Sequence, residues 1–229
     1  MTFLGLLRLW IRGAKVVGEL IELYNSIRSD IESRLSHFRR IWETKDDFEI
    51  FKEFIFCLLT PQSRAKVCWN AILKMELKGV LLNGRVEEIS EELRGVRFKR
   101  KKALYVVEAR EKFFPLKREF TLVKKIEESN GNIASLREFI VNEVKGMGYK
   151  EASHFLRNIG FGDKIAILDR HILRNLKRFG VIDDIPSSLS KRRYLEIEKK
   201  MLNFSKRINI PNSHLDLLLW FRETGEIFK

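Results

Sequence analysis

The amino-acid sequence predicts an all-α protein. Apolar residues recur every three or four positions along almost the whole chain, while the alternation of apolar and polar residues that is typical of strands is short and rare. Prolines stand between the periodic runs, at Pro61, Pro115, Pro186 and Pro211, where they end or separate helices. A chain of 229 residues is long enough to bury a substantial core.

Helices are expected wherever the apolar period persists for several turns. The expected ranges are residues 14–35, 46–59, 63–76, 86–92, 99–113, 120–129, 134–144, 150–159, 170–178, 191–204 and 213–223. The opening stretch, residues 1–15, has Arg8 and Arg12 within its apolar run and no cleavage site of small residues after it. We therefore interpret it as an amphipathic helix and not as a signal peptide.

The charge of the chain indicates the class of partner. Lysine and arginine outnumber the acidic residues by 44 to 31, giving a net charge of +13 at pH 7. This excess attracts polyanions, among which nucleic acid is the commonest in a cytosol. No run of about 18 uncharged apolar residues is present, so the sequence excludes a membrane-spanning helix. Cys57 and Cys68 are too few for a four-thiolate metal site and fit a reducing cytoplasmic setting, at the nucleoid if DNA is the partner.

Two amphipathic runs are joined by the segment KGMGYK, residues 145–150. Their apolar faces carry Leu136, Phe139, Ile140 and Val144 in the first run, and Ala152, Phe155, Leu156 and Ile159 in the second. Gly146 and Gly148 allow a sharp turn with unobstructed amides, and the dipole of the following helix adds positive potential, so the turn suits a phosphate. A glycine pair of this kind is also compatible with a tight turn that binds nothing.

The whole block, KGMGYK followed by IGF and ILDRH, resembles the helix-hairpin-helix DNA glycosylase superfamily. The resemblance implies a fold of two helical subdomains, with the hairpin gripping the DNA backbone and a catalytic-aspartate loop following it. It also implies that no cofactor is needed beyond a structural alkali cation held by hairpin carbonyls. The expected subdomains are residues 1–45 with 155–229, and a central bundle of residues 46–154 that ends in the hairpin, with the active cleft between them.

Lys150 and Asp169 match the lysine and aspartate of the bifunctional members of this superfamily. Attack on an N-glycosidic bond requires a neutral amine, so we expect the helix dipole, nearby Lys145 and partial burial to lower the pKa of Lys150. Asp169 would stabilise charge on the sugar and assist proton transfer, and the resulting Schiff base permits β-elimination. The alternatives are a phosphate-binding role for Lys150 and a capping role for Asp169.

The final segment, HLDLLLWFRETGEIFK, resembles the second, archaeal-type family of 8-oxoguanine DNA glycosylase/AP lyases. The resemblance implies that Trp220 and Lys229 lie against the flipped oxidised guanine, which an aromatic face and a cation could sandwich. Core packing is the alternative for Trp220, and a frayed terminus is the alternative for Lys229. Asp216 is interpreted as an acid at a helix start, with a lesion contact as a second possibility.

Two further segments resemble the same family. FCLLTPQSRAK offers Gln62 as a residue that enters the duplex or lines the base pocket, with Ser63 as a candidate N-cap. GVRFKRKKA offers Phe98 as a wedge that stacks on the base opposite the lesion. The flanking cations expected to meet phosphates are Arg97, Lys99 and Arg100, although a charge run is also typical of a solvated helix face.

The predicted function is therefore that of a bifunctional repair enzyme. It would flip 8-oxoguanine out of duplex DNA, excise it through a lysine Schiff base and cleave the strand by β-elimination, acting as a monomer. The alternatives are a glycosylase for another lesion, such as an oxidised pyrimidine, or a non-catalytic helix-hairpin-helix DNA-binding protein. His154 and His171 lack metal-ligand spacing, which favours structural or phosphate-contact roles, and no catalytic metal is expected.

Overall fold

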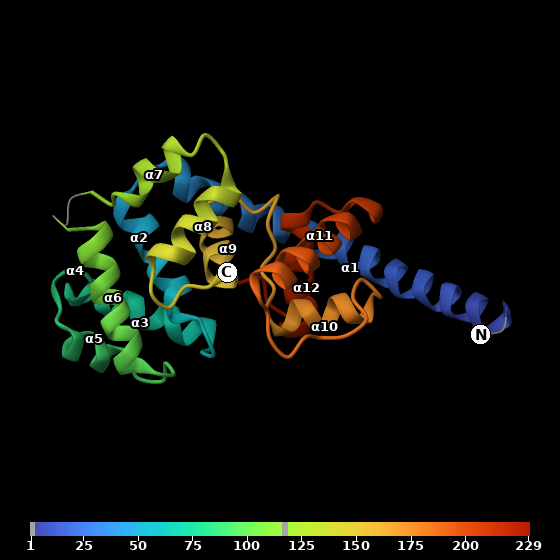
Figure 1. The fold of residues 1–229 in the computed structure, drawn as a ribbon, viewed down its shortest axis with the longest axis horizontal. Helices are drawn as coiled ribbons and strands as arrows, with labels where there is room; N and C mark the ends of the chain where they lie inside the picture. The colour runs from blue at the N-terminus through green and yellow to red at the C-terminus, as the bar shows by residue number, and fades with distance from the viewer. Residues whose placement is uncertain (1–2, 116–118) are drawn as a thin grey trace. The chain divides into compact units, whose positions relative to one another are not determined.

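The computed structural model describes residues 3–115 and 119–229, and within them the chain is helical and contains no strand (Figure 1). The predicted all-α class is confirmed. The helices are α1 (Phe3–Glu43), α2 (Asp47–Leu59), α3 (Ala65–Leu77), α4 (Val80–Asn83), α5 (Val86–Glu92), α6 (Lys99–Phe113), α7 (Leu122–Glu128), α8 (Ile133–Glu143), α9 (Tyr149–Asn158), α10 (Arg170–Arg178), α11 (Lys191–Arg207) and α12 (Asn212–Thr224). No helix among the described residues is long and apolar enough to cross a membrane.

The first helix is much longer than the predicted range 14–35. Its apolar period continues past that range to Phe38 and Ile41, both of which are buried. No proline or glycine follows Gly18 before the helix ends at Glu43, so nothing in the sequence breaks it. Its backbone confirms a helix from Phe3, whereas the amphipathic character predicted for residues 1–15 concerns side chains outside the described part of the chain.

The chain forms two compact units. Unit 1 contains the chain up to His37 together with Gly162–Phe228, and unit 2 contains Phe38–Phe161 together with Lys229. The predicted boundaries after residues 45 and 154 differ from this division because the segments next to them pack within unit 2. The guanidinium of Arg157 lies 4.9 Å from the ring of Phe38, and the rings of Trp42 and Phe161 are 5.3 Å apart.

Unit 2 is built around α2, whose residues are buried from Ile50 to Leu59. Its Phe51 and Phe54 pack against four other phenylalanines, namely Phe113 of α6, Phe155 of α9, and Phe114 and Phe120, which lie outside the helices. The contact of Phe54 with Phe155, at 5.2 Å between ring centroids, packs α9 directly against α2. The second helix of the hairpin therefore packs against the hydrophobic core of this unit.

Unit 1 joins α10 to α12 through Asn175, which is completely buried. Its side-chain amide donates to the carbonyl oxygen of Leu219 at 3.3 Å, and its oxygen accepts from the guanidinium of Arg222 at 2.8 Å. A buried amide that is bonded on both sides in this way fixes the two helices to each other, since leaving either group unpaired would be costly.

Candidate active site

The predicted hairpin is present between α8 and α9 in unit 2. Gly146 has a φ of +88°, and a Cβ atom there would come within 2.5 Å of the ring of Tyr105, so the turn requires glycine. Gly148 is the N-cap of α9, and its N–H donates to the carboxylate of Glu151 at 3.1 Å. Glu151 thus satisfies one of the amides that a helix start leaves open.

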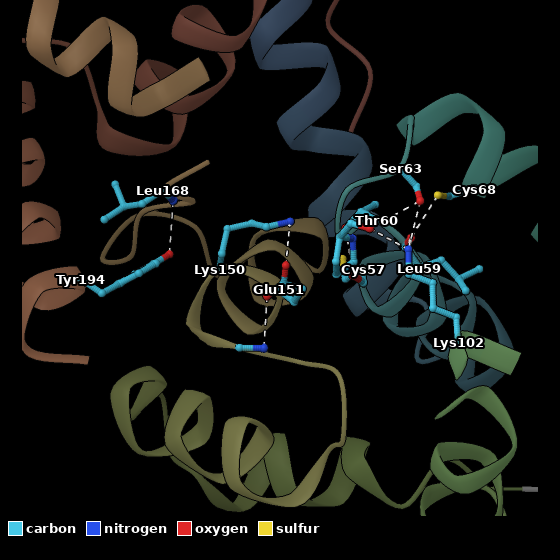
Figure 2. A network of polar contacts seen from close by, with 12 residues as sticks. Cys57, Leu59, Thr60, Ser63, Cys68, Lys102, Lys150, Glu151, Leu168 and Tyr194 are labelled. Atoms are coloured by element: carbon cyan, nitrogen blue, oxygen red, sulfur yellow. Dashed lines mark hydrogen bonds and ion pairs between the residues drawn. The ribbon is translucent and has the colours of Figure 1, made fainter. Parts of the chain in front are cut away.

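Lys150 is the second residue of α9, and its side chain is only 22 % exposed. Its Nζ lies 3.0 Å from Oε1 of Glu151, the same carboxylate that binds the Gly148 amide (Figure 2). Lys145, expected beside Lys150, instead pairs with Glu108 at 3.0 Å. The amine of Lys150 is therefore held in place by Glu151, the residue next to it in the chain.

One turn further along α9 lies His154, which is buried. Burial lowers the pKa of His154 well below its usual value, and the cations Arg157 and Lys150 lower it further, so the imidazole is neutral at pH 7. Its ring packs edge-on against Phe56, with 5.5 Å between the centroids. The phosphate contact considered for His154 therefore does not fit its burial.

Asp169 is the N-cap of α10 in unit 1, and its Oδ1 accepts from the N–H of Ile172 at 2.8 Å. The capping role is therefore confirmed, and it leaves a catalytic role open. The segment before it is held by α11. The hydroxyl of Tyr194 donates to the carbonyl of Ala166 at 2.6 Å. It also accepts from the N–H of Leu168 at 3.3 Å (Figure 2). These bonds fix the backbone that presents the carboxylate.

Trp220 lies on α12 in unit 1, where it is half-buried. Its ring meets that of His171 edge-to-face, with 5.0 Å between the centroids. Asp216 is buried and is the fifth residue of α12, which begins at Asn212, so its interpretation as a helix-start acid is wrong. The helix begins immediately after Pro211, earlier than the predicted start at residue 213.

Lys229 is only 7 % exposed in unit 2, which excludes a frayed end for this side chain. Its ammonium binds Oε1 of Glu53 and lies 3.4 Å from the ring centroid of Trp69. The other oxygen of Glu53 accepts from the side chain of Asn158 at 2.8 Å. Glu53 was not predicted from the sequence, although an acid directly before the apolar run of residues 54–59 was a signal for a buried partner.

Gln62 and Phe98 lie on two turns of unit 2 and share an uncommon backbone conformation. Their φ angles are +55° and +59°, in the left-handed region that residues with a side chain rarely adopt. Phe98 is 56 % exposed, which is unusual for so large an apolar side chain. The neighbouring cations Arg97, Lys99 and Arg100 are exposed as well. An exposed ring among cations is the arrangement expected of a wedge that contacts DNA.

Ser63 does not cap α3, contrary to the alternative considered for it. The helix begins at Ala65 with Arg64 as its N-cap. The hydroxyl of Ser63 instead accepts from the N–H of Arg97 at 3.0 Å and from Nζ of Lys102 at 3.0 Å. Both partners lie more than 30 residues away along the chain, so local pattern could not reveal them.

A helix-hairpin-helix with a lysine in the first turn of its second helix, followed by an aspartate that caps the next helix, defines a DNA glycosylase of the helix-hairpin-helix class. Comparison with known proteins specifies it further. A family model described as 8-oxoguanine DNA glycosylase matches residues 31–210, and the chain belongs to this family.

Two curated relatives are named 8-oxoguanine DNA glycosylase/AP lyase. The protein of Fusobacterium nucleatum is 46% identical over 92% of this chain and 96% of its own, and that of Methanocaldococcus jannaschii is 41% identical over 93% and 99%. The 8-oxoguanine DNA glycosylase of Thermotoga maritima superposes with a TM-score of 0.82 at 35% identity, covering 95% of this chain and 100% of its own. The M. jannaschii enzyme in complex with a 15mer DNA containing 8-oxoguanine superposes with a TM-score of 0.82 at 40% identity, covering 94% and 100%.

Proposed function

We propose that this protein excises 8-oxoguanine from duplex DNA and then cleaves the strand at the abasic site. The observation that carries the proposal is Lys150, placed in the first turn of α9 directly after the glycine hairpin, in a chain that belongs to the 8-oxoguanine DNA glycosylase family. The net charge of +13 supports a polyanionic substrate. Its proposed place of action is the nucleoid, where its proposed substrate, chromosomal DNA, lies.

The chemistry follows from an amine nucleophile. Neutral Lys150 donates its lone pair to C1′ of the flipped nucleotide as the N-glycosidic bond breaks, and the base leaves with the bonding electrons and takes up a proton. Opening of the sugar ring gives an imine between Nζ and C1′. The imine acidifies the C2′ proton, and its loss expels the 3′ phosphate. The position of the Lys150 side chain, in the first turn of α9 and only 22 % exposed, supports the role because it limits the directions from which the amine can meet a substrate.

Asp169 is proposed to stabilise the positive charge that develops on the sugar and to assist the proton transfers. Its fixed position as the N-cap of α10 supports this, since a preorganised carboxylate costs no rearrangement during the reaction. Trp220, Gln62 and Lys229 are proposed to contact the lesion. For Lys229 this requires its ammonium either to leave Glu53 or to reach the base while still bound to it.

DNA binding is proposed to use the hairpin and the exposed Phe98 turn. The hairpin turn of Gly146 and Gly148 binds phosphate, for which the Gly148 amide has to exchange the Glu151 carboxylate for the phosphate oxygen. Phe98 stacks on the base opposite the lesion, and the cations beside it contact the backbone. A structural alkali cation at the hairpin remains part of the proposal, because backbone carbonyls are the donors such a cation prefers. No step of the reaction uses it.

The test is a base-release panel under single-turnover conditions. Duplexes that carry 8-oxoguanine, an oxidised pyrimidine or no lesion are incubated with the protein, and free base and strand scission are measured separately. Release of 8-oxoguanine far above the other bases, followed by scission, is the expected result. Preferential release of the oxidised pyrimidine would assign another lesion, and tight binding without release would leave a non-catalytic DNA-binding protein.

A further inference from the structure

The lysine-rich start of α6 contains one side chain that does not face solvent. Lys102 is 4 % exposed, whereas its neighbours Lys99, Arg100 and Lys101 are all exposed. Burying an ammonium is costly, and burial lowers the pKa of Lys102. A cation is kept in such a place only where the surrounding groups compensate it, so its partners indicate what it does.

All three donors of the Lys102 ammonium are used on one short segment (Figure 2). Its Nζ donates to the carbonyl oxygens of Leu59 and Pro61, at 2.7 Å each, and to the hydroxyl of Ser63 at 3.0 Å. The Leu59 carbonyl lies at the end of α2, where the negative end of the helix dipole also favours a cation. Lys102 thus forms hydrogen bonds with residues on both sides of Gln62 and fixes this turn.

The same group of bonds reaches the second turn. The Ser63 hydroxyl accepts from the N–H of Arg97 at 3.0 Å, and the backbone N–H of Lys102 donates to the carbonyl of Phe98 at 3.0 Å. The bond to the Phe98 carbonyl belongs to the first turn of α6 and does not depend on the lysine side chain, so the Lys102 ammonium reaches this turn through Ser63 and the N–H of Arg97. Lys102 joins the Gln62 turn to the Phe98 turn.

The backbone conformation of the two turns explains why the hydrogen bonds of Lys102 and Ser63 are needed. Gln62 and Phe98 both have positive φ, and a side chain in that region persists only where the surroundings enforce it. Pro61 and Ser63 flank Gln62, and Arg97 precedes Phe98, so the contacts that enforce both turns are those of the Lys102 ammonium and the Ser63 hydroxyl. Without them, each turn is free to relax toward negative φ, which would redirect the side chain it carries.

We propose that Lys102 is a positioning residue that holds Gln62 and Phe98 in the orientation used on DNA. This rests on the proposed function, which assigns Gln62 to the lesion and Phe98 to the base left opposite. Lys102 itself does not contact the substrate. Its removal acts through the two turns and leaves the amine chemistry of Lys150 in place.

The test compares Lys102→Met with Lys101→Met, which removes the same charge from the adjacent exposed position. Single-turnover rates are measured on a duplex with 8-oxoguanine and on a duplex with a preformed abasic site, where no base has to be flipped. We expect Lys102→Met to slow excision about tenfold or more while abasic-site cleavage stays within about twofold, and Lys101→Met to match wild type on both. Equal loss on both substrates, or a wild-type excision rate, would overturn the proposal.

A double-mutant cycle with Phe98→Ala identifies the route of the effect. Phe98→Ala should slow excision in the wild-type background and have little further effect beside Lys102→Met, because the ring is already misplaced. Additive losses would show that Lys102 does not act through Phe98. Ser63→Ala, which removes the bridging hydroxyl and keeps the cation, should show the same non-additivity with a smaller loss, and it replaces Lys102→Met in the cycle if thermal unfolding shows that variant to be misfolded.

A binding readout separates failure of this proposal from failure of the proposed function. The fluorescence of 2-aminopurine placed opposite 8-oxoguanine responds to stacking and requires no excision. Wild type and Lys101→Met should alter it equally, and Lys102→Met should behave like Phe98→Ala at saturating protein. If wild type fails to release 8-oxoguanine, the proposed function is wrong. If Lys102→Met alters the fluorescence as wild type does, the positioning role is wrong.

Discussion

Replacing Glu53 by glutamine removes one partner of the buried ion pair in unit 2. Glu53 is 2 % exposed and Lys229 is 7 % exposed, so water cannot solvate the Lys229 ammonium in place of the lost carboxylate. The side chain of the variant can still bond to Asn158, but the Lys229 ammonium loses the carboxylate that compensates its charge and keeps the weaker attraction of the Trp69 ring. Removing one partner of a buried ion pair lowers the free energy of unfolding by about 3–5 kcal/mol.

The expected loss is measured as the shift in thermal unfolding. For a chain of this size, about 3–5 kcal/mol corresponds to a fall in Tm of roughly 6–20 °C. Glu49→Gln is the matched control on the same helix, because Glu49 pairs with Lys52 but is 45 % exposed. Lys52 is itself only 6 % exposed, but its ammonium keeps Glu76 at 2.9 Å when Glu49 is changed, so no buried charge loses its last partner and this variant should unfold within a few degrees of wild type.

The double variant Glu53→Gln with Lys229→Met shows whether the loss of stability comes from the Lys229 ammonium that is left buried without a carboxylate. We expect it to be more stable than the sum of the two single losses predicts, because neither charge of the pair is left stranded. A fall in stability below about 1 kcal/mol for Glu53→Gln, or additive losses in the double variant, would refute this account of the pair.

Two further predictions concern the hairpin and the aspartate. Gly146→Ala should lower stability by about 1–3 kcal/mol and weaken binding to undamaged duplex, because a φ of +88° and a Cβ within 2.5 Å of Tyr105 both oppose alanine. Gly131→Ala, at φ +78° with open space around it, is the control for backbone strain alone, and equal effects of the two changes on DNA binding would contradict the prediction. Asp169→Asn keeps a good N-cap and removes the charge, so single-turnover excision should fall roughly 10²–10⁴-fold at nearly unchanged stability. Asp169→Ala should in addition cost about 0.5–2 kcal/mol in unfolding, and a near-normal excision rate for Asp169→Asn would contradict the catalytic assignment.

The spacing of apolar residues, with breaks at proline and glycine, predicted most of the helices. Helices α5, α6 and α10 have the predicted bounds, since their apolar periods end at clear breaks in the sequence. The hairpin was predictable because two closely spaced glycines between amphipathic runs are typical of a sharp connection from one helix to the next. Helix α4 was missed because a single turn, Val80–Asn83, is too short to show a period.

The contacts that hold the site together could not be predicted in the same way. Lys229 binds Glu53 across 176 positions, and Lys102 binds the Leu59 carbonyl across 43. Long-range partners of this kind depend on the packing of helices that lie far apart in sequence. Lys102 also lies within a run of cations that is typical of a solvated helix face, and only its burial distinguishes it from the exposed lysines beside it.

Borohydride trapping tests the central claim most directly. A duplex with one 8-oxoguanine and an undamaged duplex are incubated with wild type and with Lys150→Gln in the presence of borohydride, which reduces an imine to a stable covalent adduct. The account predicts an adduct with wild type on the lesion duplex only, and none with Lys150→Gln although that variant still binds DNA. No adduct with wild type despite tight binding, or an adduct that persists in Lys150→Gln, would contradict it.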